Sequence, residues 1–210
     1  QWLGGMGIIM LGMLVLSRII GGGMALARAE LTGPSLSRLR PKLRETAFAL
    51  WKLYILLTIV EFFCLKYIGQ MTFFDSLNHS LTTMASGGFS THDASIGYYE
   101  SAKVEIIISI FMFLAGVNFT LIWLVFLKEY RKAFADEEFK SYLVYMFAAI
   151  SIIFVALMFS GISAGDSIRQ SIFQALSIGT STGYSSVNYM EWPVITHFVL
   201  LILMIVGACA

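Results

Sequence analysis

A glycine- and hydroxyl-rich stretch occurs twice in the sequence, each time between long apolar segments, and this repeat constrains the fold more than any other feature. Shifting the chain by 95 positions lays Ser76–Thr91 over Ser171–Ser186 without a gap. The shift superposes identical residues: Ser76, Leu81, Ser86, Gly88 and Ser90 meet Ser171, Leu176, Ser181, Gly183 and Ser185. Internal repetition of this kind indicates an architecture built from repeated structural units.

The composition is that of an integral membrane protein. Of the 210 residues, 58% are hydrophobic and 13% are charged, whereas soluble domains carry about 25% charged residues. The net charge of +1 gives no indication of a nucleic-acid partner. Cys64 and Cys209 both lie in apolar runs, so they suggest neither a disulfide framework nor a metal site. We expect membrane lipids as the surroundings and no organic cofactor.

Hydrophobic segments long enough to cross a bilayer alternate with shorter ones. The expected spans are Leu3–Leu16, Phe48–Ile68, Val104–Leu127, Tyr142–Ile162 and Val194–Ala210. Two segments are too short to cross and read as short helices, namely Phe73–Met84, capped by Thr72 or Asp75, and Asp166–Ser177, capped by Asp166. Each short helix leads into one copy of the glycine stretch. The order span, short helix, glycine loop, span therefore predicts an all-α polytopic fold of repeated helix–pore loop–helix units.

The repeat also divides the chain. The residues after each loop resemble one another and the start of the chain: Phe113–Asn118, Met204–Cys209 and Trp2–Gly7. We therefore interpret the sequence as an internal fragment. The expected parts are the inner helix of a first unit (1–27), a basic connection (28–47), a complete unit (48–127), a charged loop (128–140) and a following unit without the end of its inner helix (141–210).

The basic residues predict the orientation. Eleven of the 14 lysines and arginines lie in or beside the two connections that join the units. The positive-inside rule places such connections in the cytoplasm, so the glycine loops enter the membrane from the outside.

The glycine stretches suit a dehydrated alkali cation. Irregular backbone at membrane depth must be buried or line a water-filled cavity, and carbonyl oxygens there can replace an ion's hydration shell. Gly88 and Gly183 can adopt conformations that aim successive carbonyls at one axis. The short helices would direct their partially negative C-terminal ends toward the same axis. The candidate potassium ligands, mainly backbone carbonyls, are Ser86, Gly87, Gly88, Phe89, Ser181, Thr182, Gly183 and Tyr184.

The sequence resembles the potassium-translocating subunits of bacterial Trk systems, the TrkH/TrkG family within the wider Trk/Ktr/HKT superfamily. The residues that carry the resemblance are Ser86–Asp93, Gly179–Ser185, Trp2–Ile8 and Leu39–Ala47. The resemblance implies four non-identical units arranged pseudo-fourfold around a central pore, with Gly88 and Gly183 as filter glycines. It also implies potassium as the transported ion, a homodimer, a nucleotide-binding cytoplasmic subunit resembling TrkA, and location in the bacterial inner membrane.

Several residues keep more than one interpretation. Asn118 follows Gly116 on the predicted pore-lining helix, where it either faces the ion pathway or joins two helices by a hydrogen bond. Asp93 lies just outside the first loop and either concentrates cations at the mouth or caps a turn. Glu61 lies inside a span and is either functional or paired structurally, with Lys66 or with a neighbouring helix.

Three other functions remain alternatives to a potassium pore. A protein of the same fold could conduct sodium, or couple potassium to sodium or protons. An intramembrane enzyme would need a nucleophile with a base or clustered ligands within the spans, and these offer little besides Glu61. An alternating-access transporter often has inverted repeats, whereas the two copies here run parallel.

Overall fold

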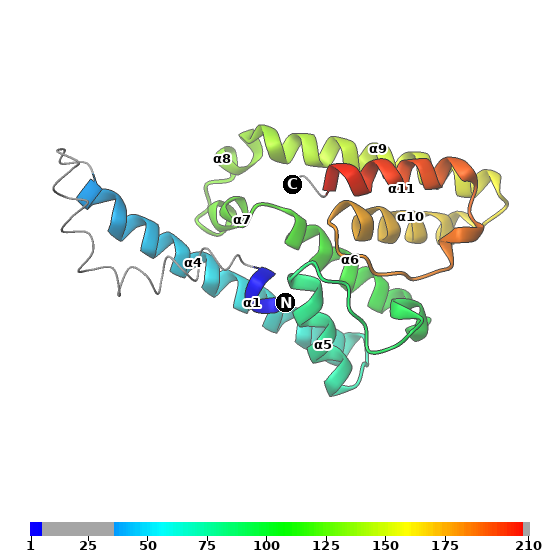
Figure 1. Ribbon diagram of the computed structural model, residues 1–210, viewed down its shortest axis with the longest axis horizontal. Helices are drawn as coiled ribbons and strands as arrows, with labels where there is room; N and C mark the ends of the chain where they lie inside the picture. The colour runs from blue at the N-terminus through cyan, green and yellow to red at the C-terminus, as the bar shows by residue number, and fades with distance from the viewer. Residues whose placement is uncertain (6–35, 208–210) are drawn as a thin grey trace.

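The computed structural model of the protein describes residues 1–5 and 36–207, and every regular element in these ranges is helical (Figure 1). The inner-helix segment expected over Leu3–Leu16 and the chain end beyond Gly207 fall largely outside the described residues. The α-helices are α1 (Trp2–Gly5), α4 (Leu36–Phe63), α5 (Phe73–Met84), α6 (Ala102–Gly116), α7 (Phe119–Phe126), α8 (Tyr130–Ala135), α9 (Glu137–Phe159), α10 (Ala164–Gly179) and α11 (Val194–Gly207). A π-helix, η1 (Cys64–Ile68), and two 3₁₀ helices, η2 (Ser95–Tyr99) and η3 (Tyr189–Glu191), complete the set.

Two described helices are long and apolar enough to cross a membrane. The first runs from Ala47 to Ile68 through α4 and η1, and the second is α9. A third crossing is formed only if the bent pair α6 and α7 counts as one span. α11 is apolar but has 14 residues. Length and apolar character therefore agree with a membrane protein.

Several boundaries differ from the sequence-based prediction. The predicted charged loop 128–140 contains α8 and the start of α9, which begins at Glu137 and not at Tyr142. α4 begins at Leu36, so the helix extends through Pro41 into the segment expected to be a loop connection. The predicted span Val104–Leu127 is broken near its middle, because α6 ends at Gly116 and α7 leaves it at an angle of 101°. Val117 is extended at the break, and the Asn118 side chain accepts a hydrogen bond from the Thr120 amide, which starts a new helix.

Both short helices begin with the same cap. The Thr72 hydroxyl accepts from the Asp75 amide at 3.1 Å and donates to the Asp75 carboxylate at 2.7 Å. Ser163 makes the same pair of bonds with Asp166, at 3.2 and 2.8 Å. The prediction of Asp166 as the cap of the second helix is therefore wrong, because Ser163 occupies that position and α10 starts at Ala164. These bonds satisfy amides that a helix start leaves without partners.

The short helices lie at the centre of the packing. α10 packs against α6, α9 and α11, while α5 packs against α4 and α6. The α6 helix thus lies between the two short helices, and the loops that follow them come together beside it (Figure 1). Fully buried side chains that include Tyr184, Phe173 and Met112 fill the core around these contacts.

Candidate functional site

The two glycine loops share an unusual backbone. Ser86 and Gly88 have φ values of +48° and +62°, and Ser181 and Gly183 have values of +57° and +88°. The residues between them do not have positive φ. Left-handed residues at alternate positions turn successive carbonyl groups toward one side, whereas successive carbonyls of a regular strand point in alternating directions. The two copies therefore have the backbone required to direct several carbonyl oxygens to one side.

A hydroxyl of each short helix holds the end of its loop. The Thr82 hydroxyl donates to the Phe89 carbonyl at 2.9 Å, and the Ser177 hydroxyl donates to the Tyr184 carbonyl at 2.6 Å. Thr82 and Ser177 are equivalent in the repeat, as are the two carbonyls. The carbonyls of Phe89 and Tyr184 therefore already have a side-chain donor, whereas those of Ser86–Gly88 and Ser181–Gly183 have none among the described residues.

The two loops approach each other at their glycines. A Cβ atom added to Gly88 would overlap the carbonyl oxygen of Thr182 and lie 2.9 Å from its carbonyl carbon. A Cβ atom on Gly183 would meet nothing within 4 Å. Gly88 is thus required by contact as well as by conformation, whereas Gly183 borders open space.

Tyr184 joins the second loop to the first unit. Its side chain is fully buried, and its hydroxyl lies 2.6 Å from the Thr82 hydroxyl, accepts from Thr83 and donates to the His79 carbonyl. Phe89, the equivalent residue, is 66% exposed. Tyr184 therefore braces its loop against the first unit, whereas the Phe89 side chain is exposed.

The segments that follow the loops are also joined. The Gly97 amide donates to the Ser185 carbonyl at 3.1 Å, and the Ser185 amide donates to the Ser95 hydroxyl at 3.3 Å. These bonds link η2, after the first loop, to the end of the second loop. The spacing between the loops is consequently fixed at Tyr184 and again at Ser185.

Repeated glycines place the preceding helices against the base of each loop. A Cβ atom on Gly5 would lie 2.7 Å from the Cα of Ala85, the residue that caps the end of α5. A Cβ atom on Gly116 would lie 2.6 Å from Cγ2 of Thr180, which caps the end of α10. Gly5 and Gly116 are equivalent in the repeat, and so are Ala85 and Thr180. Each glycine therefore allows an inner helix to touch the next loop.

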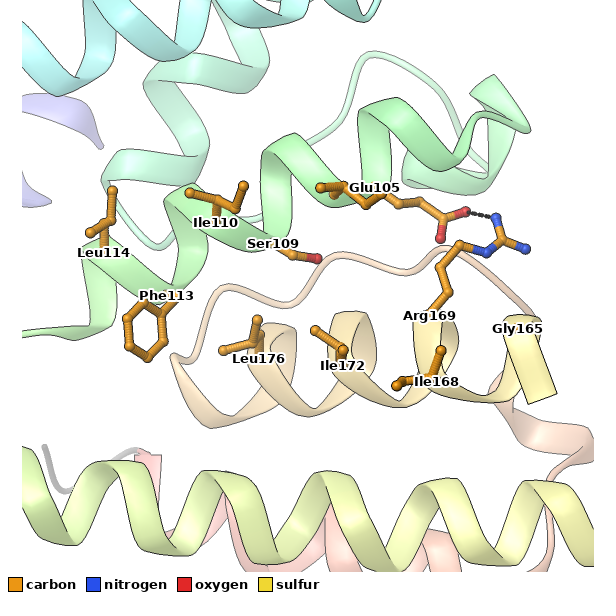
Figure 2. A pocket seen from close by; sticks show the side chains of 11 residues that line it. Glu105, Ser109, Ile110, Phe113, Leu114, Gly165, Ile168, Arg169, Ile172 and Leu176 are labelled. Atoms are coloured by element: carbon orange, nitrogen blue, oxygen red, sulfur yellow. Dashed lines mark hydrogen bonds and ion pairs between the residues drawn. The ribbon is translucent and has the colours of Figure 1, made fainter.

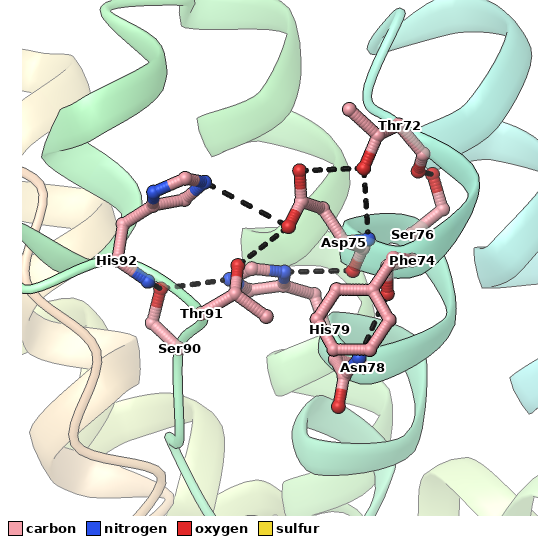
Figure 3. Close-up of polar contacts among 9 residues, drawn as sticks. All are labelled: Thr72, Phe74, Asp75, Ser76, Asn78, His79, Ser90, Thr91 and His92. Atoms are coloured by element: carbon pink, nitrogen blue, oxygen red, sulfur yellow. Dashed lines mark hydrogen bonds and ion pairs between the residues drawn. The ribbon is translucent and has the colours of Figure 1, made fainter.

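A polar network surrounds the start of α5 (Figure 3). Besides its bond with Thr72, the Asp75 carboxylate accepts from the Thr91 hydroxyl at 2.6 Å, and His92 Nε2 lies 3.7 Å away. His79 contacts the Asp75 carbonyl at 2.8 Å and the Ser90 hydroxyl at 3.0 Å. Burial raises the pKa of Asp75, but the hydrogen bonds from Thr91 and Thr72 and the nearby His92 outweigh it, so the pKa lies below its ordinary value. This network ties the segment after the first loop to the helix before it.

Asp75→Asn should remove a stabilisation that depends on pH. Because the pKa of Asp75 is lowered on folding, its contribution is present above the ordinary pKa of about 4 and is lost as the pH falls through the lowered value. We expect the variant to lose about 2 kcal/mol at neutral pH, and the difference from the unsubstituted protein to shrink below about pH 4. Thermal unfolding of the full-length protein against pH measures this. Asp93→Asn, at an exposed position after the first loop, is the control, and an equal effect there would contradict the prediction.

Other predicted site residues lie apart from the loop carbonyls. Asn118 is exposed and caps α7, and both interpretations of its side chain stay predictions for the full-length protein. Asp93 is exposed beside the polar network. Glu61 is fully buried and is not paired with Lys66, whose amine donates to the Met71 carbonyl. Thr83 of α5 lies near it, but neither Glu61 carboxylate oxygen makes a hydrogen bond with a described residue.

The two glycine loops present backbone carbonyl and hydroxyl oxygens, and clustered metal-ligating side chains are not found among the described residues. No group of three or more histidine, cysteine, aspartate or glutamate residues that could hold a metal ion occurs within residues 1–5 and 36–207. The loop-holding hydroxyls of Thr82 and Ser177 and the contact of Gly116 with Thr180 were not predicted from the sequence. The hydroxyl residues at matching positions of the repeat, and the glycine repeated at Gly5 and Gly116, could have indicated them.

Comparison with known proteins gives one consistent result. The family model of TrkH, described as "Cation transport protein", matches residues 1–210. The chain is 39% identical to the Trk system potassium uptake protein TrkH of Escherichia coli K12, covering 100% of this chain and 44% of that protein. It is 33% identical to the Trk system potassium uptake protein TrkG of the same strain, with the same coverage.

A solved structure agrees with these relatives. The crystal structure of the potassium transporter TrkH from Vibrio parahaemolyticus superposes with a TM-score of 0.76 at 34% sequence identity. The match covers 97% of this chain and 41% of that one. The chain therefore spans less than half the length of the relatives that it matches.

Proposed function

Because the chain belongs to the TrkH family of cation transport proteins, we propose that it forms part of a potassium-uptake pore. In this proposal the carbonyl oxygens of Ser86–Gly88 and Ser181–Gly183 are half of a selectivity filter. The other half belongs to two further loops of the full-length protein, in a pseudo-fourfold arrangement. The pore needs no covalent chemistry, since a potassium ion exchanges water for carbonyl oxygens and leaves inward.

One observation carries the proposal. Both loops have left-handed residues at the same two positions, directly beyond the C-terminal end of a short helix. Helix C-termini carry partial negative charge, and neutral carbonyls at close range suit a cation that has shed its water. The open space at Gly183 and the name potassium uptake protein that the relatives carry support the same conclusion.

Orientation and partners follow as further proposals. The basic connections would lie in the cytoplasm and the loops would open outward, in the bacterial inner membrane. The resemblance to Trk proteins also predicts a homodimer and a nucleotide-binding cytoplasmic subunit. Both predictions concern the full-length protein.

Ion flux through the full-length protein in liposomes tests the proposed function. We expect potassium uptake in preference to sodium, and rescue of growth at low potassium in cells that lack potassium uptake. Ser177→Ala should weaken the preference for potassium severalfold, because it removes the buried donor to the Tyr184 carbonyl. Ser151→Ala is a matched control, since its hydroxyl donates to the Phe147 carbonyl on the exposed side of α9.

Two outcomes would contradict the proposal. Equal fluxes of potassium and sodium through the unsubstituted protein would exclude a potassium filter. An unchanged preference in Ser177→Ala, with normal protein in the membrane, would separate selectivity from the loop geometry described here.

A further inference from the structure

An apolar cavity of about 590 Å³ lies between α6 and α10 (Figure 2), and none of the residues Ser86–Phe89 or Ser181–Tyr184 lines it. Its walls are aliphatic and aromatic side chains of the two helices: Ile106, Ile110 and Phe113 from α6, and Ile168, Ile172 and Leu176 from α10. Ile106 and Ile110 are more than half exposed in the described structure. The cavity is therefore an open groove that a hydrophobic chain can enter from the side.

A charged group closes the end of the groove where both helices begin. Arg169 donates to the Glu105 carboxylate at 3.0 Å and to the Asp166 carboxylate at 2.8 Å. Two carboxylates and one guanidinium leave a formal charge of −1. Glu105 and Arg169 line the groove, whereas Asp166 lies outside it and its side chain is 50% exposed. The end of the groove is thus polar and, on balance, anionic.

One oxygen at this end has no donor. Glu105 is 4% exposed, and its Oε2 makes no hydrogen bond with any described residue. A buried carboxylate oxygen without a donor is costly. The charge and the vacant acceptor together favour a ligand that brings a cationic N–H donor to Glu105.

We propose that this groove binds a phospholipid with a primary ammonium headgroup, of the phosphatidylethanolamine type. The ammonium donates to Glu105 Oε2, and an acyl chain follows the apolar walls toward Phe113 and Leu176. From Glu105 to Phe113 the α6 helix rises about 12 Å, which gives the chain a continuous apolar path. Gly165 borders the polar end, and a Cβ atom added there would meet nothing within 4 Å, so the headgroup has room.

Headgroup chemistry distinguishes this ligand from its closest analogues. Phosphatidylcholine has the same charges and chains, but its quaternary ammonium has no N–H to donate. Phosphatidylglycerol is anionic and would be attracted by Arg169 rather than by Glu105. The comparison of the three lipids therefore isolates the donor to Glu105 from general hydrophobic binding.

Native mass spectrometry of the full-length protein, with each lipid added at matched acyl chains, tests the proposal. We expect phosphatidylethanolamine to be retained about tenfold more strongly than phosphatidylcholine, as a charge-assisted hydrogen bond predicts. Glu105→Gln should remove this discrimination. Ile110→Trp, which fills the apolar groove, should reduce retention of every lipid at this site.

Two control variants keep the result specific. Asp166→Asn also removes one carboxylate partner of Arg169, but Asp166 lies outside the groove. The discrimination between phosphatidylethanolamine and phosphatidylcholine should therefore persist. Val155→Trp places the same bulk on an exposed position of α9 outside the groove and should leave retention unchanged. Three results would each overturn the proposal. The first is equal retention of phosphatidylethanolamine and phosphatidylcholine, and the second is a preference for phosphatidylglycerol. The third is that the unsubstituted protein retains no lipid and that Ile110→Trp changes nothing. The last result would mean that another part of the full-length protein fills the groove.

Discussion

Alanine at Gly88 is expected to reduce the potassium preference of the full-length protein by about tenfold or more, which corresponds to about 1.4 kcal/mol of discrimination. The residue has a φ of +62°, and a left-handed conformation costs residues with a Cβ atom roughly 1–2 kcal/mol. The new methyl group would also overlap the Thr182 carbonyl oxygen. Relief of this overlap must displace one of the proposed ion ligands. Reversal potentials or paired potassium and sodium fluxes in liposomes measure the effect.

Gly183→Ala provides a graded comparison. Its φ of +88° imposes the same kind of strain, but the added methyl group would meet nothing within 4 Å. We expect a smaller loss of selectivity than at Gly88, because the strain acts without a collision with the other loop. Gly165→Ala is the matched control, since this glycine has open space and no positive φ. Unchanged selectivity in both Gly88→Ala and Gly183→Ala, with normal thermal stability, would refute the filter assignment.

The sequence predicted the parts of the structure that depend on local pattern. α5 spans Phe73–Met84, as its apolar pattern and the Thr72 cap indicated. The repeat placed Gly88 and Gly183 at equivalent positions, and the structure gives both a positive φ. Short-range periodicity and capping decide such features, so no tertiary information is needed to find them.

The features that could not be predicted from the sequence, namely the break after α6 and the burial of Tyr184, depend on contacts between distant parts of the chain. The break after α6 lies in a run that is apolar apart from Asn118 and Thr120, and hydropathy cannot distinguish a bent pair of helices from one span. Tyr184 and Phe89 match in the repeat, yet Tyr184 alone is buried against Thr82 and Thr83 of the other unit. Such a difference arises from neighbours distant in sequence, which a single sequence does not identify.

Gly116→Val is expected to separate α6 from the base of the second loop. An added Cβ atom would lie 2.6 Å from Cγ2 of Thr180 and 2.9 Å from the Tyr142 hydroxyl, so at least one of these groups must move. Overpacking of this kind costs about 1–3 kcal/mol. Because Thr180 caps α10, the displacement should also perturb the adjoining loop at Ser181. We therefore expect lower thermal stability together with reduced potassium flux.

A double-mutant cycle tests whether the contact with Thr180 carries this effect. The first copy of the junction pairs Gly5 with Ala85, which lacks the Cγ2 atom that Gly116 meets in the second copy. Thr180→Ala should therefore offset part of the cost of Gly116→Ala, giving a coupling of roughly 0.5–1 kcal/mol. The Tyr142 hydroxyl remains close, so the rescue should be incomplete. Strictly additive effects in both thermal stability and flux would mean that Gly116 acts through Tyr142 and not through the base of the loop.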